Sequence, residues 1–219
     1  FPNIHQHYPL PWFESGEGLA QWCYANPQLS MYNINRHLVG SMGDDIQGRF
    51  VTPYDIGCGF LCKFDHEFTG KAALEKIAAN PPRTAVTLVW NPEDVGHVVA
   101  AMITPGGPEV DDITTPSDLR FAENSFFGFY EYRADQVFAG DEEIGIASGR
   151  IFSSAYHDMI SLGFISPAHA TEGEEVTVLW GTPGTKQMKV RATVAHFPYN
   201  VDMVRNEGRD VEDIPHYQG

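Results

Sequence analysis

The second half of the chain has the hydrophobic pattern of β-strands. Residues 174–180 and 188–195 alternate apolar and polar side chains with a period of two, which is typical of strands that bury one face. Further strands are predicted over 84–90, 126–132, 144–149 and 159–165, with a turn at 139–142. The pattern therefore predicts a mostly β structure from residue 84 onward.

One helix interrupts this β pattern. Asn91-Pro92-Glu93-Asp94 is a strong helix start, because it combines a capping side chain, a proline in the first turn and acids near the positive end of the helix. The apolar stripe that follows consists of Val95, Val98, Val99, Met102 and Ile103. Because Thr104-Pro105-Gly106-Gly107 then ends the pattern, the sequence predicts a helix of about three turns.

The stretch 52–78 joins an irregular first quarter to the β-rich remainder. Thr52-Pro53-Tyr54-Asp55 predicts a turn, since proline fixes φ and keeps the preceding residue extended. Residues 56–64 are predicted to form a strand in which Gly57 and Gly59 leave room for another backbone or a flat ligand. A short helix then follows, capped by Thr69, with apolar residues at helical spacing until Asn80-Pro81-Pro82.

Three other segments have clear local patterns. Residues 14–25 are compatible with a short helix that Asn26-Pro27 ends. Residues 108–123 are acidic and rich in turn formers, which predicts a mobile surface loop. Residues 206–219 are charged and poor in apolar residues, which predicts an exposed tail.

Composition excludes some classes of function. The formal charge of −15, with 14 lysines and arginines over 219 residues, argues against a nucleic-acid partner, because binding to phosphates needs clustered cations. No apolar run approaches the roughly 20 residues of a membrane span. Three cysteines form no disulfide framework, so a reducing cytoplasm is the expected location. The sequence opens on Phe1 without a signal-like segment, and we expect a piece of a longer protein.

Metal and dinucleotide sites have only weak signals. His5 and His7 would share one face of a strand, and so would Cys58 and Cys62, but spacing places no third ligand beside either pair. We therefore predict no metal site. Gly57-Cys58-Gly59 lacks the third glycine and the following helix that a dinucleotide-binding fingerprint requires.

Several motifs occur in the order seen in one known family. The proline turn, the G-x-G segment, and Phe68-Thr69-Gly70-Lys71 followed by Ala72-Ala73-Leu74 resemble the family segment D-F-I-G-[KR]-E-A-L. Residues 144–165 are similar to its G-x-[VL]-T-S-G-x-x-S-P hairpin, and 192–199 to its closing strand. The chain thus resembles the glycine cleavage T-protein, or aminomethyltransferase, family of tetrahydrofolate-dependent one-carbon transferases. KFDHEFTGKAAL followed by VTLVWN is most similar to the branch that demethylates vanillate or syringate.

This resemblance implies an α+β fold and about the C-terminal half of a family member. Residues 1–82 would end a folate-binding domain, and 83–205 would form a small antiparallel β-barrel with one inserted helix. The expected partners are the N-terminal half of its own polypeptide and a small methyl donor, such as a methoxy-aromatic acid. The group that polarises methyl transfer would lie in that N-terminal half, so no catalytic residue is assigned.

The resemblance also suggests candidate residues for a folate site. A pterin needs flat walls, and its anionic glutamate tail needs a cation near the rim. The candidate cofactor-binding residues are Trp12, Arg36, Tyr54, Phe60 and Lys63, with Arg49 as a further partner for the tail. Tyr8, Tyr32 and Tyr54 are candidate proton donors, because a phenol can supply a proton to a leaving phenolate.

Other activities of the same fold stay open. The family's Arg-Leu-Glu run is replaced here by Ile34-Asn35-Arg36-His37, so the carboxylate that contacts the pterin is not matched, which favours another methyl donor over glycine cleavage. A glycine-cleavage aminomethyltransferase and a dimethylsulfoniopropionate or N-methyl demethylase remain alternatives. A non-catalytic folate-binding or iron–sulfur assembly module is an alternative of another class, although 67–71 lacks the reactive cysteine of the assembly factors.

Overall fold

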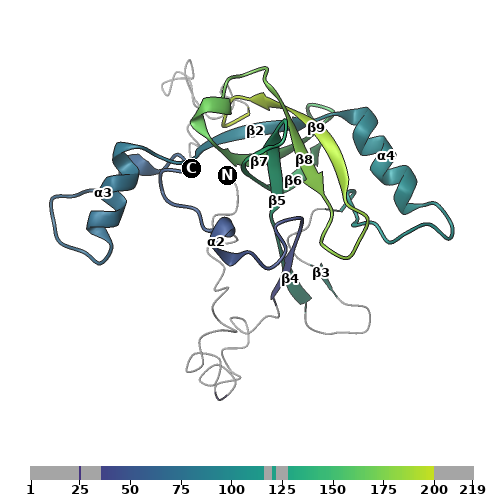
Figure 1. Ribbon diagram of the computed structural model, residues 1–219, viewed down its shortest axis with the longest axis horizontal. Coiled ribbons are helices and arrows are strands. Elements are labelled where there is room, and N and C mark those ends of the chain that lie inside the picture. Colours follow the sequence, from purple (N-terminus) through teal and green to yellow (C-terminus); the bar gives the residue numbers. More distant parts are fainter. Residues whose placement is uncertain (1–24, 26–35, 116–119, 122–127, 200–219) are drawn as a thin grey trace, which may run out of the picture.

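The computed structural model describes residues 25, 36–115, 120–121 and 128–199 (Figure 1). Its main body is a closed β-barrel whose hydrogen-bonded strand order is β2-β7-β6-β5-β8-β9, with every pair antiparallel. The strands are β2 (Thr84–Trp90), β5 (Asp135–Ala139), β6 (Glu142–Ser153), β7 (Asp158–Ile165), β8 (Glu175–Trp180) and β9 (Met188–Ala195). The predicted α+β fold with a small antiparallel barrel is therefore confirmed.

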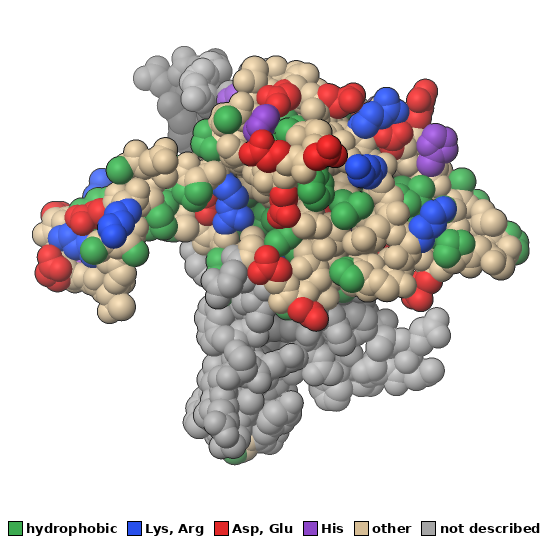
Figure 2. All heavy atoms as spheres, viewed as in Figure 1, with side chains coloured by type: hydrophobic (Ala, Val, Ile, Leu, Met, Phe, Trp, Pro, Cys, Tyr) green, Lys and Arg blue, Asp and Glu red, His purple; other side chains and the backbone are tan. Residues whose placement is uncertain are grey.

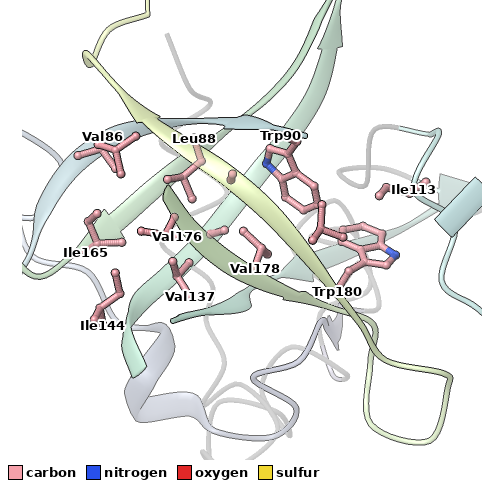
Figure 3. Close-up of a cluster of buried hydrophobic side chains, with 14 of the residues drawn as sticks. Val86, Leu88, Trp90, Ile113, Val137, Ile144, Ile165, Val176, Val178 and Trp180 are labelled. Carbon is pink, nitrogen blue, oxygen red and sulfur yellow. The ribbon is translucent and has the colours of Figure 1, made fainter. Parts of the chain in front are cut away.

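Alternating side chains fill the barrel (Figure 3). On β8, Val176, Val178 and Trp180 are buried while the residues between them are not, and β9 repeats the pattern. At one end, the Trp90 and Trp180 rings meet edge to face with centroids 5.7 Å apart. The period-two pattern of the sequence therefore corresponds to the inward face of the barrel.

Helix α4 (Pro92–Met102) covers part of the barrel, as Figure 1 shows. The Asn91 side chain accepts hydrogen bonds from the backbone N–H groups of Glu93 and Asp94, at 3.0 and 3.1 Å, which confirms the predicted cap. Val98 is fully buried against the barrel core. The helix ends one residue earlier than its apolar stripe, so Ile103 is 73% exposed rather than packed as predicted.

A second, three-stranded sheet lies beside the barrel. Its strand order is β1-β4-β3, with β1 (Arg36–Val39) parallel to β4 (Gly128–Arg133), and β3 (Arg120–Phe121) antiparallel to β4. The predicted aromatic strand is confirmed over 128–132, and residues 126–127 lie outside the described part. Because β4 runs into β5 through Ala134, this sheet joins the start of the described chain to the barrel.

The predicted strand over 56–64 is wrong. The chain instead folds into consecutive turns and a 3₁₀ helix, η4 (Gly59–Leu61), because local bonds satisfy its backbone groups. The Cys58 N–H donates to the Pro53 carbonyl at 2.7 Å, and the Cys62 N–H donates to the Gly59 carbonyl at 3.0 Å. Cys58 and Cys62 therefore flank one turn instead of sharing a strand face.

Helix α3 (Lys71–Ala79) is confirmed, and it ends before the predicted Asn80-Pro81-Pro82 stop. The predicted cap is wrong, because Gly70 occupies the N-cap position with φ of 92° and no side chain caps the helix. Helix α2 (Ile46–Arg49) is a single turn that the sequence did not indicate.

The predicted mobile loop is wrong over residues 109–113. Ile113 is fully buried in the barrel core, and the Trp180 indole N–H donates to the Asp111 carbonyl at 3.1 Å. The acidic composition suggested an exposed loop, but Ile113 packs in the core and the Asp111 carboxylate is paired with Arg133. Most of the predicted helix over 14–25, the tail 206–219, and the His5 and His7 pair lie outside the described residues. Within the described part, no helix is long and apolar enough to cross a membrane.

Candidate functional site

Tyr54 is one of the predicted folate contacts, and its side chain lies in the described part of the structure. A Cβ atom on Gly59 would lie 2.5 Å from the Tyr54 Cδ1 atom, so the absence of a side chain at Gly59 lets the ring lie against its backbone. Partial burial raises the pKa of the Tyr54 phenol, and the hydrogen-bonded Cys62 thiol raises it further. The ring of Tyr54 therefore lies against the Gly59 backbone, and its phenol loses its proton less readily than an ordinary tyrosine.

The other candidates are only partly placed. Phe60 is 73% exposed on η4 and Lys63 is exposed just after it, so both side chains are available to a ligand. Arg36 begins β1, but its side chain is outside the described part of the structure. Trp12 and the tyrosines Tyr8 and Tyr32 also lie outside it. The structure thus brings Tyr54 and Gly59 together, and every folate contact, including Tyr54, stays a prediction.

Arg49 is the exception, because the structure contradicts its assignment as a partner for the folate tail. Its guanidinium donates to the carbonyls of Val39 and Gly43, at 3.0 and 2.6 Å, and the residue is buried. Burial lowers the pKa of Arg49 to about 10, and the nearby Asp135 carboxylate opposes this change. Arg49 therefore stabilises the turn after β1 and is closed to solvent.

A buried ionic cluster lies where β4 continues into β5. We call it the Arg133 cluster, and its members are Arg133, Asp135, Asp111, Arg150 and Trp180. Arg133 pairs with Asp111 through Nη2 and with Asp135 through Nη1, the latter at 3.2 Å. Its Cζ atom lies 3.9 Å from the centroid of the Trp180 ring, and that of Arg150 lies 5.0 Å from it.

This cluster joins the turn after β1 to the barrel. The Ser41 N–H donates to Asp135 Oδ1 at 3.1 Å, and the Gln136 N–H donates to the Ser41 hydroxyl at 2.7 Å. A Cβ atom on Gly40 would lie 2.4 Å from the Ala134 carbonyl oxygen, so only glycine allows this approach. The turn is therefore fixed relative to β5 by both a charge and a close backbone contact.

The two carboxylates beside Arg133 have opposite pKa shifts. Burial raises the pKa of Asp135, and the charge of Arg133 opposes that change. Burial also favours the protonated form of Asp111, but hydrogen bonds from Arg133 and Thr182 outweigh it and lower the pKa of Asp111. Thr182 contributes through its N–H at 3.0 Å and its hydroxyl at 2.7 Å.

Arg150 fixes the segment that follows Asp111. A bulge between Ser148 and Ile151 breaks the β6–β7 register and puts Arg150 into the buried face. Its guanidinium donates to the carbonyls of Ile113 and Thr115, the second at 2.7 Å. We call residues 109–115 the strap, because they cross the barrel end between Arg150 and the β8–β9 loop, where the Lys186 N–H donates to the Glu109 carbonyl at 2.8 Å.

The Arg133 cluster was not predicted from the sequence. A signal was present, since Arg133 and Asp135 stand two apart beside apolar strand residues and therefore belong to one face. The cluster contains paired charges but no nucleophile. Its role is to hold the turn after β1 and the strap in place on the barrel. In the described part of the chain, no group of three or more His, Cys, Asp or Glu side chains could hold a metal ion.

Comparison with known proteins identifies several relatives. No protein-family model matches the chain. It is 46% identical over 217 residues to a sesamin methylene transferase from a Sinomonas species, covering 98% of this chain and 47% of that protein. It is 32% identical over 205 residues to a syringate O-demethylase from a Sphingobium species, covering 88% of this chain and 42% of that protein.

A more distant relative is an aminomethyltransferase from Streptomyces coelicolor, 29% identical over 157 residues, or 69% of this chain and 30% of that protein. A solved structure, the glycine cleavage system aminomethyltransferase T from Bartonella henselae, matches 68% of this chain and 32% of that chain. Its TM-score of 0.40 and 17% identity are too low to support an argument. The chain spans about half the length of the two relatives that it matches best among these.

Proposed function

Because this chain belongs to the aminomethyltransferase, or glycine cleavage T-protein, family over the half that it spans, we propose that it is part of an enzyme that transfers a one-carbon group from an aromatic ether oxygen to tetrahydrofolate. The observation that carries the proposal is its similarity to two proteins named for one-carbon chemistry. One is named a methylene transferase for sesamin and the other an O-demethylase for syringate.

Both transfers balance without an oxidant. From a methylenedioxy ring, two C–O bonds break and two C–N bonds form, at N5 and N10 of tetrahydrofolate, while two protons pass to the catechol oxygens. From a methoxy ring, one C–O bond breaks, one C–N bond forms at N5, and one proton passes to the phenol oxygen. In either case a proton donor beside the leaving oxygen speeds the reaction, because a neutral phenol is a better leaving group than a phenolate.

The residues present fit a folate in part. Phe60 offers an exposed ring for a pterin or benzoyl face, and the exposed Lys63 offers a cation for the glutamate tail. The Tyr54 ring lies against Gly59, the residue before Phe60, and its hydroxyl hydrogen-bonds with Cys62. Trp12 and Arg36 complete the proposed set. Tetrahydrofolate would supply the nitrogen atoms that accept the one-carbon group, and these side chains would bind and orient it.

The donor is the finer part of the proposal. A methylene bridge between two aromatic oxygens is favoured over a methoxy group, because identity is 46% to the methylene transferase and 32% to the O-demethylase. A lignin-derived methoxy-aromatic acid is the second candidate.

We also propose the domain division and the location expected from the sequence. Residues 1–82 would complete a folate-binding domain, 83–205 would form the barrel domain and 206–219 the tail. The barrel strands lie between Thr84 and Ala195, which supports the second range. Cys58 and Cys62 are free thiols, which supports a reducing, cytoplasmic location.

The test uses the full-length product of the gene that encodes this chain. It is incubated with tetrahydrofolate and sesamin, syringate or vanillate, and the folate products are separated by mass. Methylenetetrahydrofolate with a catechol product supports the methylene donor, and methyltetrahydrofolate with a demethylated acid supports the second candidate. If calorimetry detects tetrahydrofolate binding but no donor is consumed, the aromatic ether proposal is wrong. If tetrahydrofolate does not bind, the folate proposal is wrong as well.

A further inference from the structure

A projecting part of the chain has no hydrophobic core of its own. We call residues 56–82 the arm. All residues from 56 to 85 are described and none of them is buried, whereas Asp55 before this run is fully buried and Val86 after it is 4% exposed. In Figure 1 the arm carries α3 away from the barrel, on the side opposite α4.

The arm is nevertheless rich in large apolar side chains. They are Phe60, Leu61, Phe64, Phe68, Leu74 and Ile77. Ile56, at the base of the arm, instead packs against a buried cluster of the main body. Leu61 is 66% exposed, and none of the residues of α3 is buried. A helix of nine residues is too short to be stable by itself in water, and helices of this length depend on packing of an apolar face. Phe60 and Leu61 are exposed, and Phe64, Phe68, Leu74 and Ile77 are half-buried, so the arm presents apolar surface that is only partly covered.

The turn that presents Leu61 is rigid. The Leu61 N–H donates to the Cys58 carbonyl at 3.0 Å, and the Tyr54 ring lies against Gly59 two residues before Leu61. A side chain that is already fixed loses little entropy on binding, so an exposed leucine at such a position is suited to anchor an interface. Acidic and basic side chains are intermixed along the arm, as Figure 2 shows, so its contribution to binding is apolar rather than a single charge.

We propose that the arm docks against an apolar face of the N-terminal half of a polypeptide of its relatives' length, with Leu61 and the Leu74 and Ile77 face of α3 as the contacts. The chain matches 47% of the sesamin methylene transferase and 42% of the syringate O-demethylase, so each relative has enough further chain for a second folded unit. Residues 56–85, which include the arm, are the longest run of described residues without a buried one. We therefore propose the N-terminal half as the partner that covers the arm.

The test compares two substitutions in two proteins. Leu61→Asn is matched by Ile103→Asn, because Ile103 is 73% exposed at the far end of α4 and the net charge stays the same. In the 219-residue chain alone, both variants should unfold within about 1 °C of the parent, because surface substitutions have little effect. In the full-length product, Leu61→Asn should lower the unfolding midpoint by about 4 °C or more, and Ile103→Asn should not.

Amide exchange gives a second measurement that needs no variant. The Leu74 N–H, which donates to the Gly70 carbonyl at 2.9 Å, should exchange at least about tenfold more slowly in the full-length product than in the chain alone. Unchanged exchange, or a Leu61→Asn variant of the full-length product as stable as its parent, would overturn the proposal. A dimer of the 219-residue chain that Leu61→Asn dissociates would overturn it too, since the occupant would be a second copy. Neither readout involves folate or donor, so it is independent of the proposed function.

Discussion

The guanidinium of Arg133 lies 3.9 Å above the Trp180 ring and is paired with carboxylates on two other segments of the chain. Asp111 belongs to the strap and Asp135 to β5, while Trp180 ends β8. One side chain at the β4–β5 junction thus connects three parts of the barrel end. Because Arg presents a planar fork that stacks and donates at the same time, lysine cannot reproduce this arrangement.

Arg133→Ala should therefore destabilise the chain strongly. Removing one partner of a buried ion pair leaves the other charge uncompensated and costs about 3–5 kcal/mol. Arg133→Lys keeps the charge but loses the fork and the stacking, so its cost should be intermediate. Urea unfolding of the 219-residue chain measures both. Arg191→Ala is the control, because the Arg191 side chain is 44% exposed and exposed pairs contribute about 1 kcal/mol or less. Equal midpoints for the two alanine variants would contradict the account.

A second prediction concerns two glycines that both have positive φ. Gly40→Ala would place a Cβ atom 2.4 Å from the Ala134 carbonyl oxygen, whereas Gly140→Ala, at φ of 62°, meets nothing within 4 Å. Gly140→Ala should lower the free energy of unfolding by about 1–2 kcal/mol, which is the cost of holding alanine in the left-handed conformation. Gly40→Ala should cost clearly more, because the backbone contact must also break. Thermal unfolding of the two variants compares them, and a smaller loss for Gly40→Ala would show that this turn is loosely held.

The elements that sequence predicted well are those whose signal is local. Strand β2 and helix α4 carry their own apolar period and cap, and the structure places both where expected. The prediction for residues 56–64 was wrong, because the aromatic and apolar residues suggested a strand while glycine and proline allowed tighter local turns. β1 is short and its partner β4 lies far away in sequence, so no local pattern revealed it. β5 was also missed, although it forms a hairpin with β6 around the turn at 139–142 that the sequence did indicate.

The candidate site shows the same limit. Tyr54 and the open space at Gly59 were each predicted from the sequence, but their contact was not. The Arg133 cluster was missed because it unites residues 111, 133, 135, 150 and 180 through the barrel. Arg133, Asp135 and Arg150 individually look like surface charges, and only the bulge in β6 and the closure of the sheet bury them. The burial of the strap was missed for a similar reason, because its acidic residues suggested an exposed loop although Ile113 is fully buried.

A third prediction concerns stability in acid. The side chain and N–H of Arg191 hydrogen-bond to Asp94 and lower its pKa from 3.8 to about 2. A carboxyl whose pKa is lowered on folding stabilises the folded state above its unfolded pKa, and the contribution is lost as the pH falls through the folded pKa. The difference in unfolding midpoint between the parent and Asp94→Asn should therefore be full above about pH 4 and shrink towards pH 2. Asp141→Asn removes the same charge at an exposed turn and is the matched control. A constant difference for Asp94→Asn would exclude this ion pair as the cause.

The fourth prediction separates a folate contact at Lys63 from the general field of an acidic protein. A charge-assisted hydrogen bond contributes about 1.5–3 kcal/mol, so Lys63→Glu in the full-length product should raise the dissociation constant for tetrahydrofolate about tenfold or more. Lys189→Glu, exposed on β9, changes the net charge by the same amount and should have little effect. Calorimetry in about 0.15 M salt makes the comparison, because distant charges are screened there and a direct contact is screened much less. Equal weakening by both variants would mean that Lys63 acts only through the net charge, and no weakening by Lys63→Glu would remove it from the proposed site.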